Sequence, residues 1–422
     1  MRQGRMRRLA GSALAVWALA ASGCATTGGP GRAPESQPSS GVSVQKDAQG
    51  HWQLLVDGAP YMIHGITYTV SKVGQTPEGG DPVKWPDWVG FDYNGNGKSD
   101  GPYDAWVDVN RNDIQGPDEP AVGDFKLLQE MGANTIRWYH NGYHRPVPPQ
   151  KLFRDLFKTY GIRVAVGDFF GAYTIGSGAA WTKGTDYTDL VQRKKMLESV
   201  KRMVKAHRNE PYVLMWLLGN ENNLDFANTN ASSNSKAYAS LLNEAAELIR
   251  KLDPRHPVAL VNGEVDMIEP YNKYAPAIDI FGVNAYRGPR GFSDLWYDVK
   301  MTYDRPVMIT EYGQPVAVSE DDQAAYHRGC WQDIEAQRAG GSGAGNSIGG
   351  FAFEWLDLWW KAGEPDVHAQ PHTTGYQGTG EMNWSQEYYG FAAQGDGRHS
   401  PFERQLRKVY DVYKNELWHG QH

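Results

Sequence analysis

The chain has 422 residues, a formal net charge of −7, 15 tryptophans and 23 tyrosines. The acidic balance argues against nucleic-acid binding, because a nucleic-acid surface needs basic side chains that replace the counterions. The length suits one large α/β barrel domain, and the many aromatic residues fit a large core or an aromatic-lined ligand groove.

The first 23 residues have the pattern of an export signal. A basic segment, MRQGRMRR, precedes a short apolar run, LAGSALAVWALAA, which leads through small residues to Cys24. The apolar run is too short for a membrane span. The sequence around Cys24 resembles a bacterial lipobox, which implies cleavage before Cys24 and lipid attachment to it. We therefore expect an exported protein anchored to a bacterial membrane, at its periplasmic face or at the cell surface. An ordinary secretory signal is the alternative.

Residues 24–43 are rich in Gly, Pro, Ser and Thr and predict a flexible tether. The folded domain is predicted to span residues 44–422. Without the export signal the chain carries 38 basic residues against 49 acidic ones, a net charge of −11. Cys330 is the other cysteine of the sequence and has no partner if Cys24 carries a lipid, so a large core must stabilise the domain.

The folded part alternates between strand and helix patterns. Two strands around Asp57-Gly58 predict a hairpin. Strand-like runs lie near residues 61–67, 133–139, 162–169, 212–218, 257–261, 279–285, 306–311 and 348–355. Helix-like stretches lie near residues 121–131, 150–160, 187–207, 234–252, 264–274, 292–303, 320–338 and 402–417. This count predicts a single (β/α)₈ TIM barrel with a short N-terminal hairpin and a long insertion after the first strand. A doubly wound open sheet is the alternative, but the sequence has no GxGxxG or Walker motif to support nucleotide binding.

Polar or aromatic side chains follow nearly every predicted barrel strand. In a (β/α)₈ barrel these C-terminal strand ends surround the functional site. The residues at these ends are His64, Tyr139-His140, Asp168, Asn220-Glu221, Asn262, Asn284-Tyr286, Glu311 and Glu354-Trp355. A core that served stability alone would not need this pattern.

Two of these residues are acids on strands that face each other across the barrel. Glu221 follows the fourth predicted strand and Glu311 ends the seventh. Two carboxyl groups in one cleft suit glycoside hydrolysis, in which one protonates the leaving oxygen and the other attacks the anomeric carbon or activates water. Either glutamate alone would be better explained as a surface acid or as half of an ion pair.

The sequences around the two acids carry a family resemblance. WLLGNENN and ITEYG, in this order, resemble the acid/base and nucleophile motifs of retaining (β/α)₈ glycoside hydrolases. The similarity is closest to the catalytic domain of glycoside hydrolase family 2, with some likeness to β-1,3-glucanosyltransferases. GANTIRWYH, DIFGVNAYRG, GGFAFEWLDLWWK and EYYGFAAQGDGRHSPFERQLRKVY resemble further segments of that clan, so the resemblance extends over residues 52–417.

The resemblance implies an enzyme that cleaves β-linked oligo- or polysaccharides with retention. Glu221 would be the general acid/base and Glu311 the nucleophile. The implied substrate-binding residues are Arg137 and Tyr286 beside Glu311, Asn220 on a sugar hydroxyl, Trp355 as an aromatic floor, and His140 shaping the site. Asp168 would bind a distal sugar hydroxyl or cap a neighbouring loop. We expect the proton to reside on Glu221, a bell-shaped pH profile and a carboxyl separation of about 5–5.5 Å.

A second constellation of polar residues lies in the long insertion. DYNGNGKSD and DVNRNDIQGPDE place hard oxygen ligands at the alternating positions of calcium-binding loops. The predicted ligands are Asp92, Asn94, Asn96 and Asp100 in the first loop, and Asp108, Asn110, Asn112 and Glu119 in the second. We expect a structural Ca²⁺, and no cofactor for the chemistry. One site shared by both loops and a solvated loop without metal are the alternatives.

Other functions remain open at this point. A transglycosylase would use the same two glutamates and differ in the acceptor. A non-catalytic carbohydrate-binding surface protein would have no need for both acids. A calcium-dependent adhesion module would bind sugar without turnover.

Overall fold

The computed structural model describes residues 41–75, 89–140, 150–316, 319–362, 364–368 and 386–418. The predicted export signal and most of the predicted tether lie outside the described residues. Within the described parts, no helix combines the length and the apolarity that a membrane crossing requires.

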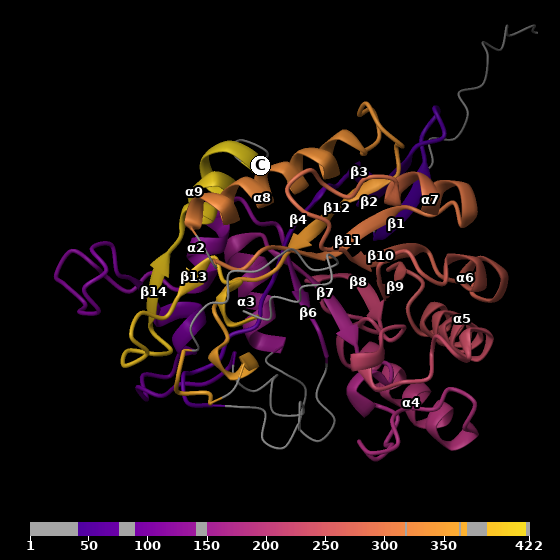
Figure 1. The fold of residues 1–422 in the computed structure, drawn as a ribbon, viewed down its shortest axis with the longest axis horizontal. Helices are drawn as coiled ribbons and strands as arrows, with labels where there is room; N and C mark the ends of the chain where they lie inside the picture. The colour runs from indigo at the N-terminus through magenta and orange to yellow at the C-terminus, as the bar shows by residue number, and fades with distance from the viewer. Residues whose placement is uncertain are drawn as a thin grey trace, which may run out of the picture. The chain divides into compact units, whose positions relative to one another are not determined.

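Eight parallel strands close into a barrel at the centre of the described domain (Figure 1). Around the barrel the order is β10, β11, β12, β4, β6, β7, β8 and β9. The strands are β4 (Ile63–Thr67), β6 (Thr135–Trp138), β7 (Arg163–Asp168), β8 (Val213–Leu218), β9 (Val258–Gly263), β10 (Ile280–Asn284), β11 (Val307–Tyr312) and β12 (Ser347–Ala352). The predicted TIM barrel is confirmed.

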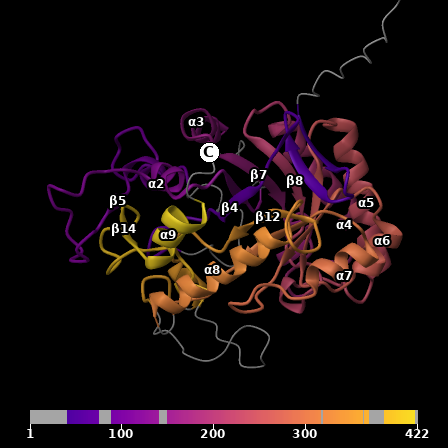
Figure 2. The ribbon, with the colours of Figure 1, turned by 90° about the horizontal axis from the view of Figure 1, so that it is seen from above.

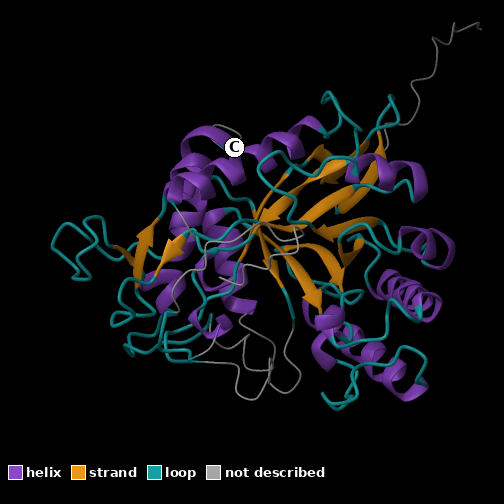
Figure 3. Ribbon diagram, viewed as in Figure 1, coloured by secondary structure: helices purple, strands orange, loops and turns teal. Residues whose placement is uncertain are grey.

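Helices cover the outside of the barrel strands (Figure 3). They are α2 (Asp124–Met131), α3 (Gln150–Tyr160), α4 (Leu190–His207), α5 (Ser235–Leu252), α6 (Ile268–Tyr274), α7 (Leu295–Thr302), α8 (Glu320–Ala336) and α9 (Lys408–Val412). Strand β8 shows why the barrel strands are apolar throughout. Leu214 and Leu217 belong to the cluster inside the barrel, whereas Trp216 and Leu218 pack against the surrounding helices. Since both faces of a barrel strand are buried, alternation is lost.

The last predicted helix, residues 402–417, is wrong in its first part. Strand β14 (Glu403–Leu406) occupies this stretch, and only then does α9 begin. Strand β14 pairs in parallel with β5 (Trp106–Val107) from the insertion and antiparallel with β13 (Ala392–Ala393). Figure 2 shows β5 and β14 side by side, away from the barrel. This small sheet joins the insertion to the C-terminal segment.

A three-stranded sheet closes the barrel at the N-terminal ends of its strands. It consists of β1 (Val42–Lys46), β2 (Trp52–Val56) and β3 (Ala59–Pro60), with the predicted hairpin turn between the last two. Val42 donates its N–H to the carbonyl of Arg255, before β9, and Trp52 donates to the carbonyl of Gly345, before β12. Val42 and Leu54 complete the apolar cluster inside the barrel.

Candidate active site

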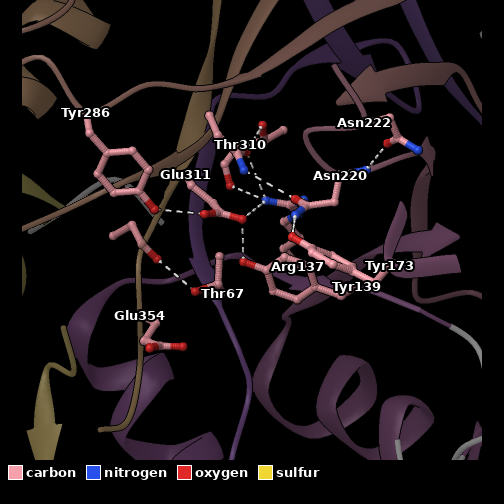
Figure 4. Close-up of polar contacts among 12 residues, drawn as sticks. Thr67, Arg137, Tyr139, Tyr173, Asn220, Asn222, Tyr286, Thr310, Glu311 and Glu354 are labelled. Atoms are coloured by element: carbon pink, nitrogen blue, oxygen red, sulfur yellow. Dashed lines mark hydrogen bonds and ion pairs between the residues drawn. The ribbon is translucent and has the colours of Figure 1, made fainter. Parts of the chain in front are cut away.

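Glu311 lies near the C-terminal end of β11 and is buried, with 6 % of its surface exposed. Its Oε1 accepts hydrogen bonds from Nη1 of Arg137 at 2.8 Å and from the hydroxyl of Tyr139 at 2.7 Å. Its Oε2 accepts one from the hydroxyl of Tyr286 at 2.8 Å. Figure 4 shows these donors around the carboxylate. A guanidinium and two phenols stabilise negative charge here, as a nucleophile requires.

Both phenols are reliable donors. Burial, followed by the charge of Glu311, raises the pKa of Tyr139 and of Tyr286 well above the usual tyrosine value. Each hydroxyl therefore keeps its proton and points it at the carboxylate. The Arg137 guanidinium also lies over the Tyr139 ring, 4.2 Å from its centroid, which fixes the two side chains relative to each other.

Arg137 connects the two predicted motifs. Its Nη1 donates to the carbonyl of Thr310 at 2.8 Å, and its Nη2 donates to Oδ1 of Asn220 at 2.7 Å. Asn284, at the end of β10, donates to the same Oδ1 at 3.2 Å and accepts from the Thr310 hydroxyl at 2.7 Å. The amide nitrogen of Asn220 then faces the hydroxyl of Tyr173 at 3.2 Å. Side chains from four barrel strands thus share one buried polar network.

Glu221 stands on a sharp turn after β8. Gly219 has φ of +87° and Glu221 has φ of +53°. A Cβ on Gly219 would lie 2.4 Å from Oδ1 of Asn222, so only glycine fits. The backbone N–H of Glu221 bonds to the carbonyl of Val261 in β9 at 3.2 Å. Left-handed backbone at a non-glycine residue is strained and concentrates at functional sites, and here the neighbouring strand holds it.

Asn222 and Asn223 lock this turn. The Oδ1 of Asn222 accepts the backbone N–H of Asn220 at 2.7 Å, and its Nδ2 donates to the carbonyls of Phe169 and Phe170 at 3.1 Å and to the Tyr187 hydroxyl at 2.7 Å. Asn223 exchanges two hydrogen bonds with the backbone of Gly263, at 2.7 and 2.8 Å. Two residues without a predicted role therefore tie the acid-bearing turn to the loops after β7 and β9.

The protonation of Glu221 is strongly shifted. Burial and, next, the charge of Glu311 raise the pKa of Glu221 to about 8, against the opposing effects of Asn284 and Arg137. The two carboxyl groups therefore interact, and the proton of the pair belongs on Glu221. This is the arrangement that a general acid beside an ionised nucleophile needs.

A third carboxyl group belongs to the same surroundings. Glu354 follows β12, is 1 % exposed, and pairs through Oε1 with Nζ of Lys361 at 3.0 Å. Burial raises the pKa of Glu354 to about 8, and Lys361 lowers it less than burial raises it. The predicted aromatic floor, Trp355, is 0 % exposed and packs against the ring of Tyr410, so it presents no open face to a sugar.

His140 and Asp168 lie together, beside the loop after β7 and outside the carboxylate network. Nδ1 of His140 accepts the N–H of Phe169 at 3.3 Å and lies 3.9 Å from Oδ2 of Asp168. Asp168 is fully buried and accepts from the N–H of Phe170 at 2.8 Å and the Ser199 hydroxyl at 2.6 Å. Both residues support this loop, and the loop-capping alternative for Asp168 fits its contacts.

Tryptophan rings near the strand ends can serve as flat surfaces for sugars, and the tryptophans of this part of the chain differ in exposure. Trp181, in the loop after β7, is 61 % exposed, whereas Trp359 is 6 % exposed and stacks on His368. Trp384 lies outside the described residues. Trp181 is therefore the one among these with an open ring face.

Sequence reasoning placed Tyr139 at a strand end without giving it a role, and it did not identify Tyr173. Tyr139 follows Arg137 by two positions on a strand, so alternation places both on the same face. That signal was present in the sequence. Tyr173 lies in a short 3₁₀ turn, Ala172–Thr174, with φ of +55°, and no periodic pattern identifies such a position.

The two predicted calcium loops fold back on their own backbones. Asp92 accepts the N–H groups of Asn96 and Gly97 at 3.0 and 2.7 Å, and Asn94 accepts that of Asn96 at 2.9 Å. Asp100 accepts the N–H of Tyr93 at 2.8 Å.

The predicted calcium ligands of the second loop do not gather around one point. Both oxygens of Glu119 are bound by backbone N–H groups, of Val109 at 2.9 Å and Gly116 at 2.8 Å. Asn112 accepts the N–H of Ile114 at 2.9 Å, and Asn110 belongs to a bend in the same loop. Asp108 instead lies with Asp113 and Glu403, whose carboxylate oxygens are within 4.8 Å of one another.

A comparison with protein families identifies this barrel. The model described as "Glycosyl hydrolases family 2, TIM barrel domain" matches residues 112–338, more than half of the chain. The chain belongs to glycosyl hydrolase family 2. The predicted family is confirmed, and the matched part of the family 2 domain contains both glutamates.

Curated family 2 proteins match in sequence at low identity. A β-glucuronidase of Chlorocebus aethiops is 26% identical over 291 residues, which cover 66% of this chain and 35% of that protein. A β-glucuronidase of Streptococcus agalactiae is 28% identical over 212 residues, 45% of this chain and 32% of that protein. The chain spans about a third of the length of these relatives.

Solved structures share the barrel. A β-D-glucuronidase of Dictyoglomus thermophilum aligns with a TM-score of 0.50 at 18% identity, over 89% of this chain and 53% of that chain. A β-glucuronidase of Bacteroides uniformis aligns with a TM-score of 0.53 at 16% identity, over 88% of this chain and 37% of that one. At these identities the likeness concerns the fold.

Proposed function

We propose that the protein is a retaining β-glycosidase with Glu311 as nucleophile and Glu221 as general acid/base. The observation that supports this most is the asymmetry of the pair. Glu311 receives three hydrogen bonds that favour its anion, and Glu221 has a pKa raised to about 8 by burial and by Glu311. Two interacting carboxyl groups with opposite protonation preferences match the double-displacement reaction.

In the first step, Glu311 attacks the anomeric carbon and the glycosidic bond breaks. Each carboxylate oxygen offers two lone pairs. Oε1 already accepts from Arg137 and Tyr139, whereas Oε2 accepts from Tyr286 alone. We therefore assign the attack to Oε2. Glu221 transfers its proton to the departing oxygen, and a glycosyl ester on Glu311 results.

In the second step, Glu221, now ionised, takes a proton from water, which attacks the anomeric carbon and releases Glu311. Asn220 is placed to hold a sugar hydroxyl, since its Nδ2 faces the site beside Tyr173 while its Oδ1 is held by Arg137. An acceptor sugar in place of water would give transglycosylation by the same residues.

The sugar at the cleaved end is the next question. The curated relatives are named β-glucuronidases, so an aryl β-glucuronide is the first substrate to assay. Lys361, a cation that could pair with the carboxylate of a glucuronide, is already engaged with Glu354 at 3.0 Å. From the described residues we therefore expect neutral aryl β-glycosides to turn over faster than the glucuronide.

The test is an assay of the wild type, Glu311→Ala and Glu221→Ala on aryl β-glucosides, β-galactosides, β-mannosides and β-glucuronides. The proposal expects turnover by the wild type, a loss of about 10³-fold or more in Glu311→Ala, and a product of unchanged anomeric configuration by NMR. Glu416→Gln, which changes a partly exposed acid paired with Arg328, is the matched control and should remain active. Sugar binding without turnover, an inverted product or a fully active Glu311→Ala would each overturn it.

A further inference from the structure

A cluster of three carboxylates lies where the insertion meets the C-terminal segment. Asp108 and Asp113 follow β5, and Glu403 begins β14. One carboxylate oxygen of each lies within 4.8 Å of the other two. Asp108 is 2 % exposed and Glu403 is 0 % exposed. Asp113 is half-buried. Gathering three carboxylates at this distance, two of them buried, is costly without a proton or a cation between them.

The side-chain amide of Gln405 lies at the centre of this cluster. Its Nε2 is 2.9 Å from Oδ2 of Asp108, 3.1 Å from Oδ1 of Asp113 and 2.9 Å from Oε1 of Glu403. An amide nitrogen carries two hydrogens, so three carboxylate oxygens compete here for two donors. Since the two ends of an amide are assigned from their surroundings, a cation here would turn the Gln405 oxygen toward it as a fourth ligand.

Glu403 provides an independent indication of a missing partner. Its side chain is fully buried, its Oε1 faces the cluster, and its Oε2 has no hydrogen-bond partner among the described residues. A buried carboxylate oxygen without a donor is costly. The cations nearby do not serve it, because Arg111 pairs with Glu320 at 2.6 Å and Arg404 is engaged by Asp124 at 2.7 Å.

Gly395 packs closely against the cluster. A Cβ at this position would lie 2.1 Å from Oε1 of Glu403 and 2.3 Å from Oδ1 of Asp113, and the residue has φ of +54°. The next residue, Asp396, donates its backbone N–H to the same oxygen of Asp113 at 3.0 Å. The space that a side chain would fill is therefore bordered by two carboxylate oxygens.

We propose that Asp108, Asp113, Glu403 and Gln405 bind one Ca²⁺, which joins the insertion to β14. The set supplies hard oxygen ligands from three carboxylates and one amide, as Ca²⁺ prefers, and backbone carbonyls or water would complete the six to eight ligands. This site differs from the predicted loops, because it combines two residues of the second loop, Asp108 and Asp113, with residues about 300 positions later.

The proposed site would stabilise the segments that pack beside the end of β12, and it takes no part in the chemistry. Strand β14 is followed by Arg407, whose guanidinium pairs with buried Asp357 at 2.6 Å. Asp357 lies three residues after Glu354, in the segment that follows β12. Calcium would therefore hold β14, and through Arg407 the end of the eighth barrel strand, against the insertion.

The experiment compares the full chain with the double variant Asp113→Asn, Glu403→Gln after removal of divalent ions with EDTA. Ca²⁺ binding is measured by isothermal titration calorimetry, and stability by thermal unfolding with and without CaCl₂. We expect the wild type to bind one more Ca²⁺ than the double variant. At a free Ca²⁺ concentration of about 100 times the dissociation constant, the Tm of the wild type should rise by a few degrees. This rise should be lost or strongly reduced in the double variant.

Two further variants test the alternatives that the first loop binds the Ca²⁺ or that the carboxylates share a proton. Asp92→Asn, in the first loop, should keep the extra site. Gln405→Glu adds a fourth carboxylate and should raise calcium affinity about tenfold or more, because affinity follows ligand charge, while lowering Tm in EDTA. Equal stoichiometry and equal Tm rise in the wild type and the double variant would overturn the proposal. So would a Gln405→Glu variant that is destabilised but gains no affinity, which indicates a shared proton instead of a cation.

Discussion

The carboxylate of Glu311 is oriented and stabilised by side chains that lie far away in the sequence. Arg137, Tyr139 and Tyr286 come from two different strands and saturate one oxygen while leaving the other partly free. The motif ITEYG predicts the acid, but the number of its donors emerges only when the barrel closes. The environment of a single residue thus depends on strands from different parts of the barrel.

Tyr139 is the first residue to test. Tyr139→Phe removes one hydrogen bond to a buried charged oxygen, which contributes roughly 1.5–3 kcal/mol, so we expect kcat to fall about 10- to 100-fold. Because the lost donor favoured the anion, the acidic limb of the pH profile should move to higher pH. The measurement is kcat/KM against pH, with Tyr103→Phe, a tyrosine that bonds Asp155 outside the site, as the control. An unchanged acidic limb would contradict the role given to Tyr139.

Activity should fall as the pH rises through about 8. Glu221 must be protonated to donate to the leaving oxygen, and its pKa is raised to about 8. Above that value the proton is lost, so the basic limb of the bell-shaped profile reports this group or the coupled pair. A profile of kcat/KM from pH 4 to 10 checks it, and a basic limb near pH 5 would argue against Glu221 as the acid.

The ionisation of Glu221 should also lower the free energy of unfolding as the pH rises toward neutral and alkaline values. Its folded pKa, about 8, exceeds the unfolded value of about 4.3, so the folded protein binds the proton more tightly. Raising the pH from about 4.3 to 8 therefore weakens the fold. Glu221→Gln cannot ionise, and its Tm relative to the wild type should rise across this window. Thermal unfolding at pH 5 and pH 8 measures the difference, and equal differences at both would refute it.

At the scale of elements, the turn after β8 depends on side chains that bond to backbone. Asn222 uses both ends of its amide, bonding one N–H and two carbonyls. We expect Asn222→Ala to lower stability by about 1–3 kcal/mol, since buried groups lose partners, and to lower kcat because Glu221 is displaced. Chemical denaturation and steady-state kinetics test this, with Asn243→Ala on α5 as the control. Unchanged kcat in Asn222→Ala would show that the turn holds Glu221 without it.

Local pattern and long-range pairing compete in the segment 402–417. Phe402, Leu406, Val409 and Tyr413 have helical spacing, which explains the predicted helix. The first residues instead form β14, because Glu403 and Arg404 pair with Trp106 and Val107 of β5. The barrel strands and the flanking helices were predictable because their apolar runs carry the signal themselves. The small sheet was not, since its partners are distant in the sequence.

The same reasoning applies to the residues of the proposed calcium site. Alternating Asp and Asn positions in the insertion indicate oxygen ligands, and Asp108 does belong to the carboxylate cluster. Glu403 and Gln405 could not be predicted, because no local spacing connects them to Asp108. The active-site glutamates were easier to find, since strand ends of a parallel barrel converge by topology.

At the scale of the whole molecule, the predicted export signal can be tested directly. If Cys24 carries a lipid, we expect Cys24→Ala to move the protein from the membrane fraction to the soluble exported fraction, because the predicted attachment site is removed. Fractionation of expressing cells followed by an activity assay measures this, with Cys330→Ala as the control, since Cys330 is buried. Membrane association that survives Cys24→Ala would leave the lipobox reading unsupported.

The sheet of β1 to β3 determines at which end of the barrel the chain enters the domain. It covers the barrel at the strand starts, beside Arg255 and Gly345, whereas Glu311 lies near a strand end. The chain therefore enters the described domain at the end of the barrel opposite Glu311. An attachment through the residues before β1 would lie at that end of the barrel, away from the strand end that carries Glu311.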